Sequence, residues 1–398
     1  MNINLKVFPD FFRSASAGGI ILIIALVVSL LIANSPWGAA FANFLSLELG
    51  YESDQIHLRY PILLWVNDGL MAIFFLLVGL EIKREMVEGE LSSFRKAALP
   101  VFAAMGGMFI PAGIYALVNA GTDTASGWGI PMATDIAFAI GLLSLLGSRV
   151  PIGLKVFLTA LAIVDDLGAI AVIAFFYSSG IQVSNLLYAL GIFLGLLVLN
   201  RLGVKSLIFY LVPGFFIWYF IHHSGVHATI AGVLTALAIP TTPDATESPL
   251  EKLEHALTKP VNFLIMPIFA LANTNIRFEE GMVEGIFNPL GLGVILGLCV
   301  GKPVGILLSS WLAVKLKISV LPQGVNWPMV VGLGLLAGIG FTMSIFIALL
   351  SFSDPAYHTE AKFCILVASV ASGVLGYITL RVVANKQAAA SLRHTNGL

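Results

Sequence analysis

Long apolar runs fill most of this 398-residue chain, and only short polar segments separate them. A helix needs about 20 apolar residues to cross the hydrocarbon core of a bilayer. The runs therefore predict an all-α, polytopic membrane protein rather than a chain with a large water-exposed domain. Twelve spans are predicted, near residues 14–33, 60–82, 97–119, 127–147, 152–177, 184–201, 206–221, 225–240, 256–275, 290–314, 328–352 and 360–384.

The composition excludes several other classes of protein. The chain is 58% hydrophobic and only 11% charged, whereas soluble domains are about 25% charged. So few charges cannot cover a water-facing surface, which excludes a soluble enzyme and a disordered chain. The 21 Lys and Arg residues balance 22 Asp and Glu residues without forming a basic stripe, so no nucleic-acid partner is expected. Cys299 and Cys364 lie in apolar runs and imply no disulfide framework.

Lys and Arg are distributed unevenly among the segments between the spans. If the N-terminus is cytoplasmic, 17 of the 21 lie on the cytoplasmic side and 3 lie outside, while Lys302 lies within a span. Cytoplasmic loops carry an excess of these residues, so both termini are predicted to be cytoplasmic. Asp10 argues against a cleaved signal peptide at the first run. We expect one transmembrane domain over residues 1–385 and a disordered cytoplasmic tail over 386–398.

One outer segment has the period-two pattern of a β-hairpin. Between residues 45 and 58, leucines alternate with polar residues before Gly50 and Asp54, which are typical of turns. An isolated two-stranded hairpin is marginal in water, so we expect this one to pair with a partner such as a second copy of itself. The alternative is an irregular loop on the membrane surface.

Five ionisable residues stand well inside apolar runs. They are Asp68, Asp135, Asp165, Asp166 and Lys302. Such groups are costly in a membrane, face the interior of the helix bundle and mark ion or proton pathways. These five positions are therefore the main candidates for a functional site.

Asp165 and Asp166 lie side by side in the middle of a span. Adjacent helical residues point about 100° apart, so the two carboxyl groups look into one cavity from different sides. Desolvation disfavours the charged form of a carboxyl group, which then holds either a proton or a small cation. Hard cations prefer oxygen ligands. The pair predicts proton-coupled cation exchange, and the alternative is a structural pair bonded to polar neighbours.

Lys302 needs a carboxylate partner because a charged amine in mid-span is costly when unpaired. The sequence leaves the choice open between the Asp165–Asp166 pair and Asp135. An ion pair that breaks when the carboxyl group takes a cation or a proton would couple occupancy to conformation. A static salt bridge is the alternative.

Two spans carry interruptions in their helical pattern. Residues 129–135 place Pro, Thr and Asp in an apolar run, and residues 337–344 place two Gly, a Thr and a Ser in another. Interrupted spans in corresponding halves of a chain point to discontinuous helices around a midplane site. The half-helix ends expose dipole charge, which Asp135 at facing N-termini and Lys302 at facing C-termini would neutralise.

Two clusters of mixed charge lie at cytoplasmic span ends. They contain Glu81, Lys83, Arg84, Glu85 and Glu88 in one, and Glu251, Lys252, Glu254 and His255 in the other. Either they are solvated helix ends with pairs three and four residues apart, or they sense pH at the mouth of a transport path. His227, in an apolar run, is either a hydrogen-bonded core residue or a sensor.

Several segments together resemble the NhaA family of bacterial sodium/proton antiporters. The resemblance runs from about residue 8 to about residue 385, and its residues are LLVGLEIKREMVEGEL, GIPMATDIAFAIGLLSLLGSRVP, LTALAIVDDLGAIAVIAFFY, SGVHATIAG, VGKPVGI and GIGFTMSIFIA. It implies a transporter of the inner membrane, not an enzyme, that needs no cofactor and exchanges external protons for cytoplasmic Na⁺ or Li⁺ electrogenically and under pH control.

The resemblance also implies an architecture. Spans three to five and ten to twelve would form inverted repeats, and spans four and eleven would be unwound and cross in mid-membrane. The hairpin at 45–58 would be the contact of a homodimer.

The resemblance implies roles for individual residues. Na⁺ would bind at Asp165, Asp166 and Thr134, and the two carboxyl groups would also take the protons. Asp135 and Lys302 would compensate the helix ends. Asp68 would line an outer funnel, and pH sensing and gating would involve Glu81, Arg84, Glu85, Glu254, His255 and His227. The chain departs from the family pattern at Glu251 and Thr258, where further basic residues are usual, so we expect a shifted activation pH.

Other functions fit the sequence less well. A channel would need a continuous polar stripe, and a sodium-coupled symporter would need groups that recognise an organic solute. An intramembrane aspartyl protease would need two carboxyl groups from different helices sharing one proton, whereas Asp165 and Asp166 are adjacent on one helix. Metal-dependent prenyl transfer would need two separated acidic motifs.

Overall fold

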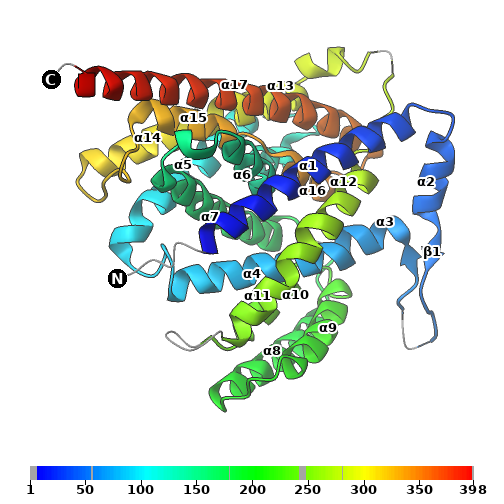
Figure 1. Ribbon diagram of the computed structural model, residues 1–398. Coiled ribbons are helices and arrows are strands. Elements are labelled where there is room, and N and C mark those ends of the chain that lie inside the picture. Colours follow the sequence, from blue (N-terminus) through cyan, green and yellow to red (C-terminus); the bar gives the residue numbers. More distant parts are fainter. Residues whose placement is uncertain (1–6, 55–56, 179, 242–247, 280, 397–398) are drawn as a thin grey trace. The chain divides into compact units, whose positions relative to one another are not determined.

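The computed structural model describes residues 7–54, 57–178, 180–241, 248–279 and 281–396. Helices make up almost all of this part of the chain (Figure 1). Eight of the described helices are long and apolar enough to cross a membrane, or up to ten if each of two bent helix pairs counts as one span. The all-α, multi-pass architecture is thus confirmed. The predicted spans 206–221 and 225–240 correspond to shorter helices, α9 (Ile208–His222) and α10 (Ile230–Ala238).

The chain divides into two compact units. Unit 1 comprises residues 1–20, 93–169 and 279–398, and unit 2 comprises residues 21–92 and 170–278. Each unit is therefore assembled from segments that lie far apart in the sequence.

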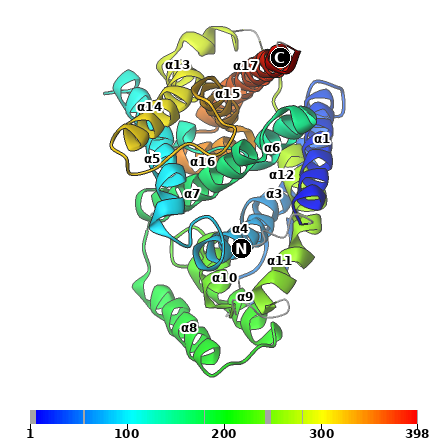
Figure 2. The same cartoon turned by 60° about the vertical axis from the view of Figure 1, so that its left-hand side comes forward.

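Unit 1 contains the segments that carry Asp135, Asp165, Asp166 and Lys302. Its elements are the first part of α1 (Val7–Ala33), α5 (Phe94–Val118), η2 (Ala125–Met132), α6 (Ile136–Leu145), η3 (Gly147–Arg149), α7 (Ile152–Phe176) as far as Ala169, η5 (Glu284–Phe287), α13 (Pro289–Leu296), η6 (Gly297–Gly301), α14 (Lys302–Lys315), α15 (Trp327–Ala337), α16 (Phe341–Ser351) and α17 (Pro355–Asn396). Here η2, η3 and η5 are 3₁₀-helices and η6 is a π-helix. Helix α14 packs between α5 and α15, and α15 also packs on α17 (Figure 2).

The contact between α5 and α14 is a backbone-to-backbone approach. A Cβ atom built on Gly305 would lie 2.1 Å from the carbonyl oxygen of Gly106, so neither position has room for a side chain. Small residues allow such close packing between helices that share no hydrophobic driving force in lipid. This approach fixes α14, which begins at Lys302.

Two helix breaks in unit 1 coincide with the interruptions predicted from the sequence. The 3₁₀-helix η2 ends at Met132, and residues 133–135 have no regular structure before α6 begins at Ile136. Helices α15 and α16 are separated by residues 338–340 and bent by 48°.

Unit 2 contains the later part of α1 together with the hairpin region. Its elements are the later part of α1 (Val7–Ala33), α2 (Gly38–Ser46), β1 (Glu48–Leu49), β2 (Tyr60–Pro61), α3 (Ile62–Leu64), η1 (Trp65–Leu70), α4 (Met71–Val87), α8 (Val183–Arg201), α9, α10, α11 (Pro249–Pro260), η4 (Val261–Ile265) and α12 (Met266–Asn273). Helix α10 packs on α4 and α9, and α8 packs on α9. Leu80, Tyr210, Ile217 and Leu250 belong to its buried core.

The predicted hairpin exists, but its boundaries of 45–58 were wrong. Strands β1 and β2 pair antiparallel with Glu48 opposite Pro61, and an isolated bridge joins Glu52 to His57. Helix α2 continues to Ser46, so the alternating leucines began inside a helix whose Leu45 is buried. The return strand lies beyond the predicted end of the hairpin. Residues 55–56 of the prediction lie outside the described residues. The prediction of a disordered tail over 386–398 was wrong for its described part, because α17 continues as a helix to Asn396, while residues 397–398 lie outside the described residues.

The close approach of α5 and α14 generates a stability prediction. Gly305→Ala places a methyl group against a backbone oxygen and should lower the free energy of unfolding by about 1–3 kcal/mol. The control is Gly191→Ala in α8, where no described atom lies within 4 Å of the added Cβ. This change should stabilise by up to about 1 kcal/mol through helix propensity. Thermal unfolding in detergent measures both, and equal effects of the two changes would contradict the packing account.

Candidate ion-binding site

Asp165 is the centre of a buried polar cluster in unit 1. Its Oδ2 atom accepts a hydrogen bond from Lys302 Nζ at 2.7 Å and another from Thr134 Oγ1 at 2.8 Å. The side chains of Asp165 and Lys302 are fully buried, and Thr134 is 0% exposed. Of the possible partners of Lys302, the structure therefore selects Asp165.

The second carboxyl oxygen of Asp165 is also buried. Its Oδ1 atom makes no hydrogen bond with any residue that the structure describes. Leaving a buried acceptor unsatisfied costs about 1–3 kcal/mol. A proton on this oxygen or a cation beside it would remove that cost. Asp166 follows on the same helix and is buried as well, with 2% of its surface exposed.

Lys302 also contacts the end of a helix. Its Nζ atom donates to the carbonyl oxygen of Met132, the last residue of η2. The C-terminal end of a helix carries partial negative charge on its free carbonyl groups. The ammonium group is therefore shared between one carboxylate and one helix end.

Thr134 connects Asp165 to the other helix break. Its Oγ1 atom lies 2.9 Å from the carbonyl oxygen of Ala337, which ends α15, as well as near Asp165. A hydroxyl group has one hydrogen to donate but two lone pairs. If Thr134 donates to Ala337, its oxygen can accept or coordinate on the side of Asp165.

Asp135 holds the starts of two helices together. Its Oδ1 atom accepts the backbone N–H of Phe138 at 3.1 Å, which caps α6. Its Oδ2 atom accepts both the hydroxyl group and the backbone N–H of Thr342, the latter at 3.1 Å, in the first turn of α16. The Asp135 backbone N–H donates to Ile339 at 2.6 Å. One buried carboxylate thus lies at two helix N-termini, where negative charge is favourable.

Three polar partners in this region were not chosen from the sequence. They are Thr342, Ser344, whose hydroxyl group donates to Ile130 at 2.7 Å, and Ser369, which accepts the backbone N–H of Phe341 at 3.1 Å. Thr342 and Ser344 lie in the interrupted run 337–344, which was the available signal. Ser369 lies in an ordinary apolar run and gave none.

The remaining predicted residues lie in unit 2. Asp68 lies in the π-helix η1, where its Oδ2 atom is 3.1 Å from His222 Nδ1 and its carbonyl oxygen accepts Trp218 Nε1 at 3.3 Å. His227 lies in the turn between α9 and α10, half-buried, with Nε2 3.0 Å from the carbonyl oxygen of Tyr177. His222 was not chosen from the sequence.

Arg84 is the central cation of the charged cluster. It forms ion pairs with Glu254 and, at 3.1 Å, with Glu85. Glu254 is buried and Glu81, one turn before Glu85, is half-buried, whereas His255 is exposed. The cluster therefore joins α4 to α11 within unit 2.

Glu251 and Thr258, the two residues that depart from the family pattern, form hydrogen bonds within α11 and its N-terminal cap. Glu251 forms a capping box with Ser248, in which Glu251 Oε2 accepts the Ser248 backbone N–H at 2.7 Å. The hydroxyl group of Thr258 donates to the carbonyl oxygen of Glu254 at 2.7 Å. These bonds hold both side chains on α11.

The chain is similar to known proteins over nearly its whole length. The family described as Na⁺/H⁺ antiporter 1 matches residues 9–380. The Na(+)/H(+) antiporter NhaA 2 of Flavobacterium johnsoniae is 66% identical over 379 residues, covering 95% of this chain and 93% of that protein. The NhaA antiporter of Flavobacterium psychrophilum is 51% identical over 94% of this chain and 96% of its own, and that of Shewanella oneidensis is 48% identical over 96% and 99%. The resemblance drawn from the sequence is confirmed.

The double cap at Asp135 generates a second prediction. Asp135→Ala removes two helix caps at about 1 kcal/mol each, so the free energy of unfolding should fall by about 2 kcal/mol. Asp135→Asn offers one acceptor oxygen in place of two and should lose about half as much. Thermal unfolding in detergent gives the ranking. If the alanine variant is as stable as the wild type, Asp135 does not hold the two helices.

Proposed function

Because the chain belongs to the Na⁺/H⁺ antiporter 1 family, we propose that it exchanges sodium ions for protons across the bacterial inner membrane. The observation that carries this proposal is the buried carboxyl group of Asp165, with one oxygen bonded to Lys302 and the other without a hydrogen bond among the described residues. Antiport by relatives with 48–66% identity supports the same substrates, Na⁺ and H⁺. The protein is a transporter, and the proposal needs neither a catalytic residue nor a cofactor.

We propose that a proton and Na⁺ compete for the Asp165–Asp166 pair. Na⁺ prefers oxygen ligands, and the proposed set is the two carboxyl groups with the hydroxyl oxygen of Thr134. Thr134 is suited to this role because its hydrogen can turn to the Ala337 carbonyl oxygen. When Na⁺ binds, Lys302 interacts less strongly with Asp165 and still donates a hydrogen bond to the Met132 carbonyl oxygen at the end of η2.

Exchange further requires that the site opens to one side at a time. We propose twelve spans with both termini cytoplasmic, in a single domain over residues 1–385. Spans three to five and ten to twelve are proposed as inverted repeats. The breaks at residues 133–135 and 338–340 support two discontinuous helices that cross in mid-membrane, because Asp135 of the first break bonds to Ile339 in the second and to Thr342 just after it. Such crossings place polar backbone where a site can use it.

The direction and charge of transport follow the family. We propose that cytoplasmic Na⁺ or Li⁺ leaves in exchange for a larger number of external protons, so that the exchange is electrogenic and driven by the proton-motive force. The physiological role is then sodium and pH homeostasis.

We propose that the cluster around Arg84 senses cytoplasmic pH. Glu85 and Glu254 share the guanidinium group of Arg84, and Glu81 lies one turn before Glu85 on α4, so protonating any of them changes the balance of charge between α4 and α11. His255 and His227 are proposed to contribute. Glu251 and Thr258 act on α11 itself, which supports an activation pH that differs from relatives with basic residues there.

Two further assignments concern the outer side. Asp68 is proposed to line the extracytoplasmic funnel of the transport path. The hairpin of β1 and β2 is proposed to contact a second copy in a homodimer, since two short strands alone are marginal in water.

Everted vesicles with an acid interior test the exchange directly. Added Na⁺ or Li⁺, but not K⁺, should collapse the pH gradient reported by a dye. Asp165→Asn and Asp166→Asn should each abolish this response, because the neutral amide cannot trade a proton for a cation. Asp123→Asn, at an exposed turn, is the matched control and should behave as wild type. A gradient that Na⁺ leaves untouched at every pH would overturn the proposed function.

A further inference from the structure

His222 makes an ion pair that the proposed exchange does not use. It lies in the last turn of α9, and its Nδ1 atom is 3.1 Å from Oδ2 of Asp68 in η1. The two side chains are 15% and 18% exposed. They are therefore shielded enough to interact strongly, yet water and protons still reach them.

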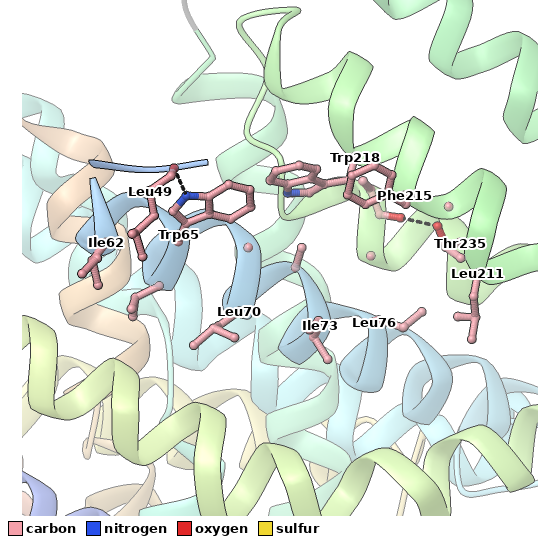
Figure 3. A pocket seen from close by; sticks show the side chains of 16 residues that line it. Leu49, Ile62, Trp65, Leu70, Ile73, Leu76, Leu211, Phe215, Trp218 and Thr235 are labelled. Carbon is pink, nitrogen blue, oxygen red and sulfur yellow. Dashed lines mark hydrogen bonds between the residues drawn. The ribbon is translucent and has the colours of Figure 1, made fainter. Parts of the chain in front are cut away.

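Aromatic rings enclose His222. The ring of Trp218 stacks on it at 5.6 Å between centroids with an interplanar angle of 20°, and Tyr60 of β2 meets it edge-on at 4.9 Å. Trp218 in turn stacks on Trp65 at 5.8 Å, and Figure 3 shows these two tryptophans side by side above α4. A tryptophan face attracts a cation. Both the carboxylate of Asp68 and the ring face of Trp218 are therefore partners for a cation at this position.

Helix α9 binds Asp68 through two residues one turn apart. Trp218 donates to the carbonyl oxygen of Asp68, and His222 contacts its carboxylate. The bond from Trp218 is insensitive to pH, whereas the contact from His222 depends on a proton. The bond from Trp218 thus holds the backbone of Asp68 in place. The ion pair between the Asp68 carboxylate and His222 can form or break without moving it.

The other titratable groups near His222 come from every element around it. Tyr219 lies on α9 and His223 directly follows its last residue, and His223 Nε2 is 3.2 Å from the hydroxyl group of Tyr60. The turn before α10 brings His227, whose charge repels that of His222. The hairpin brings Glu52, whose charge, like that of Asp68, interacts electrostatically with the side chain of Tyr60. α8 brings Tyr188, which contacts Phe220. Among these groups, Asp68 is the carboxylate that bonds directly to His222.

We propose that His222 is a proton-binding residue of the extracytoplasmic opening, and that its ion pair with Asp68 sets how strongly this opening attracts sodium. When His222 carries a proton, the charge of Asp68 is neutralised and Na⁺ is attracted weakly. When external pH rises and the proton leaves, Asp68 presents a full negative charge to arriving cations. This inference rests on the proposed antiport and on the outer position of Asp68.

Right-side-out vesicles test the proposal, because external pH and external Na⁺ can be set together. The quantity is the apparent KM for ²²Na⁺ uptake driven by an outward proton gradient, at external pH of about 5.5 and about 8, on either side of the usual histidine range. Protons also compete at Asp165, so each variant is compared with wild type at the same pH.

His222→Gln and His222→Arg should deviate from wild type at opposite ends of this range. At about pH 8, His222→Arg keeps Asp68 paired, so its KM should be about fivefold higher than wild type, while His222→Gln matches wild type. At about pH 5.5, His222→Gln should have a KM about fivefold lower, while His222→Arg matches wild type. A factor of about five is what one unit charge a few ångströms away contributes in water. His223→Gln, which alters the neighbour bonded to Tyr60, should follow wild type at both values.

A second comparison guards against effects on folding. In an Asp68→Asn background, His222→Gln should change KM at neither pH. Equal deviations at both pH values, or a full effect of His222→Gln without Asp68, would overturn the proposal. Absence of sodium/proton exchange in the wild type would instead refute the proposed function before any variant is compared.

Discussion

The ion pair between Lys302 and Asp165 is the interaction on which the rest of the site depends. Removing two charges from water costs several kcal/mol per ion, and their attraction repays this only when further hydrogen bonds satisfy both groups. The Met132 carbonyl oxygen and the Thr134 hydroxyl group supply such bonds. The acceptor Oδ1 of Asp165 is left over among the described residues. These bonds stabilise the ion pair in a dry interior. The unsatisfied Oδ1 atom of Asp165 still leaves a position at which a proton or a cation can bind.

The two helix breaks provide the partners that make this pair possible. Regular helices satisfy all their backbone groups internally and offer nothing to a buried ion. The end of η2 frees the Met132 carbonyl oxygen for Lys302, and the end of α15 frees the Ala337 carbonyl oxygen for Thr134. Asp135 offsets the opposite helix ends by accepting from α6 and α16. A Gly-lined contact between α5 and α14 brings Lys302 within reach, because a side chain at Gly305 would separate the helices.

Much of this arrangement could be predicted because charges in apolar runs are expensive. Asp135, Asp165 and Lys302 stood out for that reason, and the breaks were marked by Pro, Gly and Thr. The partner of Lys302 could not be predicted, since its long side chain can reach several carboxyl groups and tertiary packing makes the choice. Thr342 and Ser369 are small polar residues that cost little in a helix and leave no signal. The hairpin boundaries failed because leucines spaced two apart fit a strand and also the end of α2, where Leu45 is buried.

The proposed exchange requires sodium and protons to compete for one buried carboxyl site. The most direct measurement is proton release from the purified protein in weakly buffered detergent solution, followed with a pH indicator as NaCl is added. Competition predicts a saturable release with Na⁺, none with choline chloride, and none from Asp165→Asn. Sodium binding that stabilises the protein against heat without releasing any proton would contradict the account, because the ion would then occupy a site that protons do not share.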